Sequence, residues 1–275
     1  MYPHIGTPVA QNHASRQAAL CLNQKNECRP TAQTHSGTLL VISMQDTLRE
    51  TYKLWADQPE YKTRIKTARD LIRDTISHHK TYVAYSGGKD SLVMTHLVIQ
   101  EDPDILVWHW DYGPAYMPRA IEHEVRDIAM AIGVKNYKVD TTPLYQKLGR
   151  TAKGVLGRVL YGRVIPEMVN AGYSASFVGL RSEESLKRKR RTQSVYEKTA
   201  PGMTTVFPIR GLTVRDVWAY IASNDLPYCS HYDRYGALEG WESVRFCTYF
   251  DPEFAWMGRA NVDGVIQPEF RNLPK

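Results

Sequence analysis

The sequence predicts an α/β fold in which a doubly wound, mainly parallel sheet of five strands carries helices on both faces. Short apolar segments rich in β-branched and aromatic residues alternate with longer segments whose apolar residues recur every three or four positions. This alternation is typical of strand–helix–strand units, whose right-handed crossovers make neighbouring strands parallel. The first predicted strand also runs directly into a glycine turn that opens a helix, and ligands of α/β proteins bind at such strand ends.

One domain with two extensions is expected. Residues 1–43 mix polar residues and prolines without an apolar period, which predicts a disordered or loosely packed extension. Its cysteines, Cys21 and Cys28, are spaced more widely than typical zinc ligands. Residues 44–225 carry the alternating pattern and form the predicted domain. Residues 226–275 are rich in loops and aromatic residues and are expected to pack on that domain as a C-terminal extension.

The predicted elements follow one another through residues 44–225. An amphipathic helix is expected over residues 45–79, where apolar residues recur at helical spacing. The other helices are predicted directly after the glycine turn and over residues 121–132, 143–170 and 214–222. The five strands are predicted over residues 81–85, 105–110, 137–139, 176–179 and 204–209. Gly133 is placed to end a helix in the left-handed conformation, and Thr213 with Asp216 has the pattern of a capping box.

The segment SGGKDS, which begins at Ser86, carries the strongest functional signal. Gly87 and Gly88 let the backbone turn sharply and present its N–H groups, and the N-terminus of the following helix carries partial positive charge. Lys89 adds a positive charge, and the hydroxyls of Ser86 and Ser91 add hydrogen-bond donors. The turn therefore predicts a bound anion, most often a phosphate. A Walker loop and a G-x-G-x-x-G dinucleotide loop are both excluded by the spacing of the glycines.

Two further segments are predicted to reach the same crevice. Asp111 follows the second strand, and Arg181 follows the fourth strand in a basic segment that continues through Arg188. Because the carboxyl ends of parallel strands meet at one edge of a sheet, Ser86, Asp111 and Arg181 are expected to face one another. Taken alone, the basic run over residues 187–191 fits a solvated surface or a nucleic-acid-binding patch as well as it fits an anion-binding part of the crevice.

Composition supports an anionic ligand. The chain of 275 residues carries a net charge of +6 and has a pI of about 9.0, which suits a nucleotide, a nucleic acid or both. No segment approaches the ~18 to 20 apolar residues of a membrane span, and the N-terminus lacks a signal-peptide pattern. A cytoplasmic protein without membrane association is expected, and its cysteines would then be reduced.

Three segments resemble a known family in order and spacing. SGGKDS resembles the PP-loop of the adenine nucleotide alpha hydrolase superfamily, whose members cleave ATP between its α and β phosphates or bind a sulfated adenosine nucleotide. GLRSEES, from Gly179, and PIRGLTVRDVWAYIASNDLPY, from Pro208, resemble the phosphoadenosine phosphosulfate (PAPS) reductase family of that superfamily. The turn that starts at Asp111 resembles the family's Asp-Thr-Gly. The resemblance covers roughly residues 80–250 and implies a Rossmann-like PP-loop domain that binds ATP or a sulfated adenosine nucleotide.

The resemblance also implies roles for individual residues. Lys89, Asp90 and Arg181 are the catalytic candidates, and Arg181 and Arg188 match anion-binding arginines, whose planar forks suit phosphate. Asp90 matches the position at which ATP-cleaving relatives hold a metal-linked carboxylate, which suits Mg²⁺. Asp111 matches a turn near the adenosine or the metal. The predicted nucleotide-binding set is Ser86, Gly87, Gly88, Lys89, Asp90, Ser91, Asp111, Gly179, Arg181 and Arg188.

The cysteines depart from the family pattern. A sulfonucleotide reductase attacks sulfur with a thiolate. The family carries this thiolate in a Glu-Cys-Gly-Leu-His segment near the C-terminus. Residues 267–275 read QPEFRNLPK and do not contain that segment. Cys229 and Cys247 are too few for a four-thiolate cluster, so an iron–sulfur cofactor is not expected. Together with His231 they fit zinc binding, sulfur exchange or plain core packing, and the sequence leaves these alternatives open.

Three functions are therefore compatible with the sequence. The first is an ATP pyrophosphatase or adenylyltransferase that adenylylates an acceptor, either a protein or a nucleic acid, in nucleic-acid modification or sulfur metabolism. The second is a phosphoadenylyl-sulfate or adenylyl-sulfate reductase, which the family resemblance favours and the missing thiol opposes. The third is a nucleotide-binding subunit without catalysis. A homo-oligomer or a larger complex is compatible with each.

Overall fold

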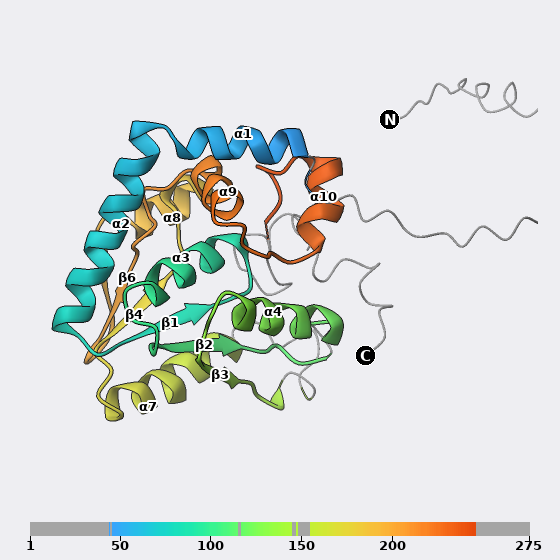
Figure 1. Ribbon diagram of the computed structural model, residues 1–275. Coiled ribbons are helices and arrows are strands. Elements are labelled where there is room, and N and C mark those ends of the chain that lie inside the picture. Colours follow the sequence, from blue (N-terminus) through green and yellow to red (C-terminus); the bar gives the residue numbers. More distant parts are fainter. Residues whose placement is uncertain (1–43, 45, 115–116, 145–146, 148–154, 246–275) are drawn as a thin grey trace, which may run out of the picture. The chain divides into compact units, whose positions relative to one another are not determined.

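The computed structural model of the chain describes residues 44, 46–114, 117–144, 147 and 155–245 (Figure 1). The predictions for residues 1–43 and for Cys247 lie outside these ranges. Among the described helices, none is long and apolar enough to cross a membrane.

A six-stranded sheet lies at the centre of the described part, in the order β3-β2-β1-β4-β6-β5. Its strands are β1 (Thr81–Tyr85), β2 (Leu106–Trp110), β3 (Asn136–Asp140), β4 (Ala175–Val178), β5 (Tyr196–Ala200) and β6 (Met203–Val206). Neighbouring strands pair in parallel except β5 with β6. The predicted fold class, a doubly wound and mainly parallel sheet, is confirmed.

The strand β5 is the main difference from the predicted sheet of five strands. It forms an antiparallel hairpin with β6 through a turn in which Gly202 has a φ of +76°. Its sequence, YEKTA, lacks an apolar core face, and its side chains are exposed or half-buried because the strand lies at the edge of the sheet. Strand prediction from apolar patterning therefore misses it. The neighbouring strand β6 ends at Val206 rather than at residue 209.

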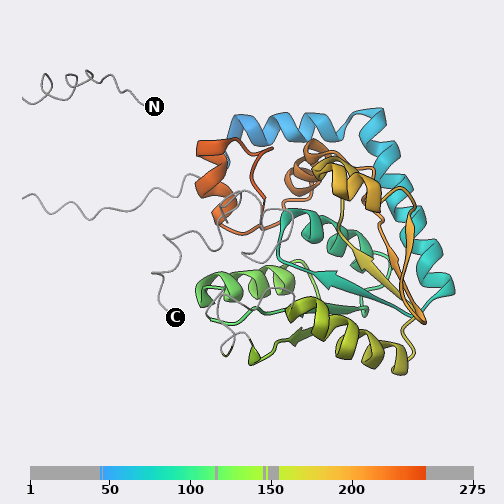
Figure 2. The ribbon, with the colours of Figure 1, turned by 180° about the vertical axis from the view of Figure 1, so that it is seen from behind.

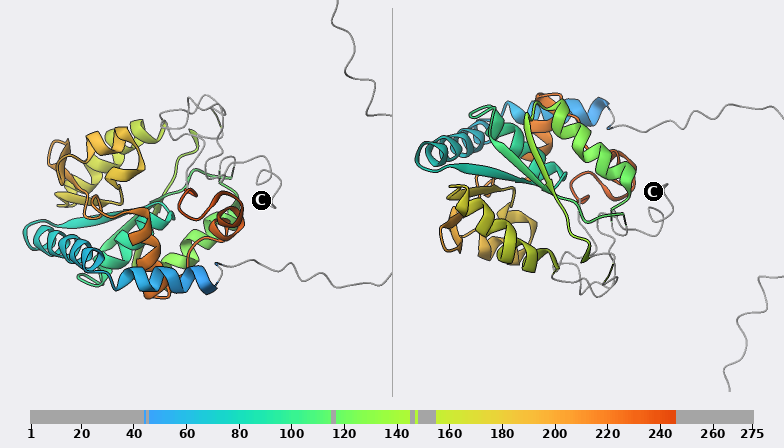
Figure 3. Two further views of the ribbon diagram at one scale, coloured as in Figure 1. Left: turned by 90° about the horizontal axis from the view of Figure 1, so that it is seen from above. Right: turned by 90° about the horizontal axis from the view of Figure 1, so that it is seen from below.

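Helices cover both faces of the sheet (Figures 2 and 3). The helices α3, α4 and α9 lie on one face, where α1 packs on α9, and α7 and α8 lie on the other (Figure 3). The helices are α1 (Asp46–Ala56), α2 (Pro59–His78), α3 (Lys89–Ile99), α4 (Arg119–Ala131), α6 (Val155–Val159), α7 (Ile165–Asn170), α8 (Leu186–Arg191), α9 (Val214–Ser223) and α10 (His231–Glu239). A π-helical turn, η2 (Leu160–Val164), joins α6 to α7, and a 3₁₀ turn, η3 (Ser182–Glu184), precedes α8.

Two helical predictions need correction. The single helix expected over residues 45–79 is divided into α1 and α2, because Pro59 starts a new helix as its first residue and cannot continue the preceding one. The sequence predicts neither α8, whose segment is expected to be a basic loop, nor α10, since LKRKRR and HYDRYGALE have no clear apolar period. The predicted ends are confirmed: Gly133 has a φ of +99°, and Thr213 and Asp216 form a reciprocal capping box on α9.

The core includes nearly all of β1 and α3. The helix α3 is buried nearly all round, as expected for a helix that is apolar on every side and lies between the sheet and other helices. From β1 the chain runs outward through β2 to β3, then returns to the other side of β1 at β4. This reversal makes the boundary between β1 and β4 the topological switch point, where α/β sheets bind ligands.

Gly87→Ala is expected to lower the free energy of unfolding by roughly 2–4 kcal/mol, because it combines a left-handed backbone with overpacking. Gly87 has a φ of +81°, and an added Cβ would lie 2.5 Å from Cγ2 of Val125. Gly157→Ala is the matched control: Gly157 lies in α6 with nothing within 4 Å of an added Cβ. This control should stabilise the protein by up to about 1 kcal/mol. Urea unfolding measures both, and equal stabilities of the two variants would contradict the packing described.

Candidate functional site

The glycine turn between β1 and α3 depends on two glycines, Gly87 and Gly179, at which a side chain would not fit. Gly87 adopts the left-handed region, which only glycine enters at little cost. From the other side, Gly179 at the end of β4 approaches the first turn of α3 so closely that an added Cβ would lie 2.9 Å from Cα of Ser91. Both glycines are therefore required for the ends of β1 and β4 to lie against the start of α3.

Ser91 holds this turn closed. Its hydroxyl accepts hydrogen bonds from the backbone N–H of Ser86 at 3.2 Å and from the Ser86 hydroxyl at 3.0 Å. It donates to the carbonyl of Gly88 at 2.9 Å. The three bonds fix the shape of the turn, and Ser86, Gly88 and Ser91 all line the same pocket.

Lys89, which the sequence predicts to reach a phosphate, is buried beneath the segment that follows α9. Its ammonium donates to the carbonyl of Val244 at 2.8 Å and lies 3.6 Å from the carboxylate of Asp90. Its backbone N–H donates to the hydroxyl of Tyr232, in α10, at 2.9 Å. The first N–H group of α3 is thus bonded to a tyrosine that itself lines the pocket.

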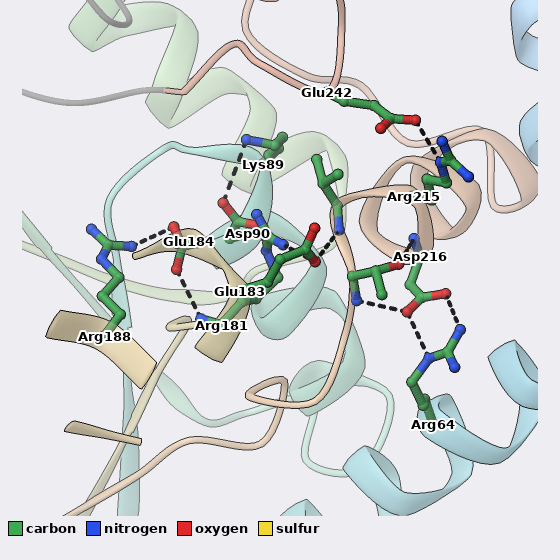
Figure 4. A network of polar contacts seen from close by, with 12 residues as sticks. Arg64, Lys89, Asp90, Arg181, Glu183, Glu184, Arg188, Arg215, Asp216 and Glu242 are labelled. Carbon is green, nitrogen blue, oxygen red and sulfur yellow. Dashed lines mark hydrogen bonds and ion pairs between the residues drawn. The ribbon is translucent and has the colours of Figure 1, made fainter. Parts of the chain in front are cut away.

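Asp90 and Arg181 form a buried ion pair between α3 and the loop after β4 (Figure 4). The Nε of Arg181 donates to Oδ1 of Asp90 at 2.5 Å, and the two side chains are 4% and 14% exposed, respectively. Burial by itself raises the pKa of Asp90, but the charges of Lys89 and Arg181 outweigh it and hold that pKa well below its usual range. Asp90 is therefore ionised at neutral pH, and Arg181 is already paired.

Two neighbouring glutamates extend this pair into a network. Glu183 accepts from Arg181 at 3.2 Å and from the backbone N–H of Val214, at the start of α9, at 3.0 Å. Glu184, whose side chain is 2% exposed, accepts from the guanidinium of Arg188 and, at 3.3 Å, from that of Arg245. The carboxylate of Glu184 thereby gathers two arginines, and both of them line the pocket.

The pocket has a volume of about 280 Å³ and lies at the carboxyl ends of β1, β2 and β4. Its lining divides into three groups. The glycine turn and the end of β4 form the middle. An aromatic and apolar part follows from β2 onward and contains Trp108, His109, Trp110, Tyr112 and Met117. Arg188 and Arg245 form a cationic part. A planar apolar group fits the first part of such a pocket, and anionic oxygens fit the turn and the arginines.

The structure brings only some of the predicted site residues to this pocket. Six of the predicted residues line it, namely Ser86, Gly88, Asp90, Ser91, Gly179 and Arg188. The other four, Gly87, Lys89, Asp111 and Arg181, do not appear in the lining. Asp111 follows β2 as expected, yet its carboxylate accepts two hydrogen bonds from Arg119, at 2.7 and 2.8 Å. Its pKa lies below the ordinary value because these bonds outweigh the effect of burial.

Several lining residues were missed in the sequence. Trp108 and His109 occupy the end of a predicted strand, so the strand-end rule could have identified them. His109 is fixed between the β1 carbonyl of Tyr85 and the carboxylate of Glu122, each at 2.9 Å from a ring nitrogen. No sequence pattern around Arg245 indicates a site, because Arg245 reaches the pocket only through the path that the chain takes after α10.

A metal ligand role for Asp90 does not fit this arrangement. Its carboxylate already faces Arg181 and Lys89, so a cation held by it would lie beside two positive charges. Within the described ranges, no group of three His, Cys, Asp or Glu residues could hold a metal ion. Mg²⁺ commonly reaches such sites bound to the phosphates of a nucleotide.

Cys229 is buried and lies beneath the glycine turn. Its thiol donates to the carbonyl of Gly87 at 3.5 Å, and burial raises its pKa well above the ordinary value. Burial and, to a smaller extent, the charge of Lys89 lower the pKa of the nearby His231 to about 3. The thiol and the neutral imidazole are thus the forms expected at neutral pH, and a reactive thiolate is disfavoured.

The fold and the pocket define a PP-loop nucleotide-binding domain of the α/β class. The family model for the phosphoadenosine phosphosulfate reductase domain matches residues 80–245, more than half of the chain. The chain belongs to this family, within the PP-loop superfamily.

Comparison with solved structures gives distant similarities. The phosphoadenylyl-sulfate (PAPS) reductase from Candida auris, in a phosphate complex, is 17% identical, with 70% of this chain and 93% of that chain covered at a TM-score of 0.49. The FMN adenylyltransferase of Candida glabrata, in complex with FAD and inorganic pyrophosphate, is 15% identical, with 69% and 67% covered at a TM-score of 0.49. The comparison with curated proteins found no match.

Asp90→Asn is expected to lower the free energy of unfolding at pH 7 by about 3 kcal/mol, because it leaves Lys89 and Arg181 buried without their shared negative charge. The pKa of Asp90 is lower in the folded than in the unfolded protein. Its contribution is therefore complete above the unfolded pKa of about 3.9 and is lost as the pH falls toward the folded pKa. The difference between wild type and variant should shrink between about pH 5 and pH 3.

Urea unfolding over this pH range measures the difference. Asp225→Asn is the control, since Asp225 pairs with Arg49 but its side chain is 74% exposed. This substitution should leave the free energy of unfolding nearly unchanged, because an exposed ion pair contributes little to stability. A similar loss in the two variants, or a loss at Asp90 that does not depend on pH, would contradict the buried pair.

Proposed function

We propose that the protein binds ATP in this pocket and cleaves it between the α and β phosphates, transferring the adenylyl group to an acceptor. The observation that carries the proposal is the order of the pocket lining. The aromatic part comes from the end of β2, on one side of β1, whereas Arg188 and Arg245 are held by Glu184 after β4, the strand on the other side of β1. A base in the aromatic part and phosphates along the turn would place the terminal phosphates by the two arginines.

The chemical step would be an in-line displacement. A nucleophilic atom of the acceptor attacks the α phosphorus, and the bond from that phosphorus to the bridging oxygen of the β phosphate breaks. Pyrophosphate leaves with the electron pair, and the proton of the acceptor passes to solvent. Catalysis of this kind is mainly positioning and charge stabilisation. Mg²⁺ bound to the phosphates would neutralise part of their charge.

The side chains have distinct parts in this proposal. Arg188 and Arg245 would bind the leaving pyrophosphate, because planar guanidinium groups suit bidentate contact with phosphate oxygens. Glu184 would hold both arginines toward the pocket. Lys89, Asp90 and Arg181, the catalytic candidates from the sequence, would act mainly by holding the turn against β4 and by adding positive potential beneath it.

Adenylyl transfer is favoured over reduction by the state of Cys229. Reduction of a sulfonucleotide needs a thiolate that attacks sulfur. Among the described residues Cys229 is the free cysteine, and its thiol is buried with a raised pKa. The reductase alternative therefore requires a thiol from elsewhere, and phosphate chemistry at the arginines requires none.

The direct test incubates the full chain with ATP and Mg²⁺, and separately with PAPS and thioredoxin, and identifies the products by mass spectrometry. AMP, free or attached to an acceptor, and pyrophosphate are expected from ATP. Sulfite from PAPS without ATP cleavage would establish the reductase alternative. Tight nucleotide binding without any product would establish a binding subunit, and either result overturns the proposal.

Arg188→Ala is expected to lower kcat/KM for ATP cleavage by about 100-fold, since it removes a charged group that stabilises the leaving phosphates. Arg188→Lys should recover only part of the loss, because a point charge replaces a planar fork. Arg191→Ala is the matched control: Arg191 lies on the same helix and pairs with Glu197 at 2.8 Å. It should stay within about twofold of wild type, as do most surface changes away from a site. Equal losses in Arg188→Ala and Arg191→Ala would exclude a specific role for Arg188.

A further inference from the structure

The helix α8 presents two different faces. It has the sequence LKRKRR over Leu186–Arg191. Side chains four residues apart share a helix face, so Arg188 and Thr192 point the same way. Arg188 pairs with the buried Glu184, and Thr192 is fully buried, which makes this the inner face. Lys187, Lys189 and Arg190 are exposed, and they form the outer face together with Leu186.

The cations of the outer face are not neutralised by neighbouring carboxylates. Arg191 pairs with Glu197. Among the residues that the structure describes, no acidic side chain lies within ion-pairing distance of Lys187, Lys189 or Arg190. These charges are therefore available to an external anion, in contrast to the lysines of α2, such as Lys66 with Asp70 at 2.5 Å.

We propose that the outer face of α8 binds the phosphate backbone of a nucleic acid strand and so places the acceptor of the adenylyl group beside the pocket. The proposal rests on the adenylyl transfer proposed above. Lys187 and Arg190 lie about 4.5 Å apart along the helix axis, and their long, flexible side chains let the two charges contact successive phosphates of one strand. Three cations can thus contact two or three successive phosphates.

The position of α8 connects this surface to the chemistry. Its inner face contributes Arg188 to the pocket lining, whereas its outer face is exposed. A helix with its side chains is about 10–12 Å wide. A strand bound on the outer face would therefore lie about one helix width from the phosphates of a nucleotide in the pocket, near enough for a base or a terminal hydroxyl to extend into it.

Leu186 favours a nucleic acid over an acidic peptide as the partner. Its side chain is 75% exposed at the start of α8, directly before Lys187. An apolar side chain among cations can pack on the face of a base or sugar while its neighbours contact phosphates. An acidic peptide, which offers carboxylates but no base or sugar, would leave the Leu186 side chain exposed to water. The net charge of +6 adds long-range attraction for a polyanion.

The test measures binding of fluorescein-labelled 20-nucleotide DNA and RNA strands to the full chain by anisotropy, without ATP. Three phosphate contacts predict that log Kd rises with log salt with a slope of about 2, since each contact on a single strand adds ~0.7. The triple variant Lys187→Ala, Lys189→Ala, Arg190→Ala should bind at least 10-fold more weakly at low salt and lose most of this slope.

The matched control removes three lysines from α1 and α2, of which Lys62 and Lys66 are exposed and Lys53 is half-buried: Lys53→Ala, Lys62→Ala, Lys66→Ala. It should bind within about twofold of wild type, because those lysines are already paired with acidic neighbours. Equal weakening in the two triple variants, no binding by wild type, or equally tight binding of polyglutamate would overturn the proposal.

A second readout separates this inference from the proposed function. Both triple variants should cleave ATP without added strands at the wild-type rate, and the α8 variant should lose any stimulation by nucleic acid. Mass spectrometry of the strand should show the addition of one AMP with wild type. Cleavage of ATP without nucleic acid binding would overturn the α8 surface alone. Specific binding through α8 without ATP cleavage would overturn the adenylyl transfer and keep the surface.

Discussion

The buried ion pair between Asp90 and Arg181 is the interaction on which the site depends. It joins the first turn of α3 to the loop after β4, so the two elements that flank the topological switch point are fixed to each other. Gly179 allows their backbones to approach within contact distance. The carboxylate of Asp90 also faces the ammonium of Lys89, so it stabilises two buried cations. Each of these three charges would be costly to bury without its partners.

This pair is part of a wider network that makes the cationic side of the pocket rigid. Glu183 links Arg181 to the start of α9. Asp216, in the first turn of α9, accepts two hydrogen bonds from Arg64 of α2, each at 2.7 Å. Four elements distant in sequence are thereby connected by charged groups (Figure 4). Glu184 then directs Arg188 and Arg245 into the pocket from a fixed base, a form of preorganisation that favours anion binding.

Sequence patterns predicted the strands and the turn whose own residues carry a local signal, either an apolar run or a pair of glycines. Apolar runs gave β1, β2 and β4, and the glycine turn predicted the strand-to-helix junction with its pocket. The strand β5 was missed because an edge strand with polar side chains has no core-facing period. The pairing of Arg181 with Asp90, and the positions of Arg245 and Tyr232 at the pocket, depend on contacts across more than 60 residues, for which local patterning has no signal.

These contacts change the roles that the sequence predicts for the arginines near the PP-loop. Of the two arginines that match the family pattern, Arg181 is buried in an ion pair, while Arg188 lines the pocket together with Arg245. A crystal structure of the full chain with a non-hydrolysable ATP analogue tests this most directly. We expect β and γ phosphate oxygens within hydrogen-bond distance of Arg188 and Arg245, with the Asp90–Arg181 pair intact. Phosphates bound to Arg181 with that pair broken, or an analogue bound away from the glycine turn, would contradict it.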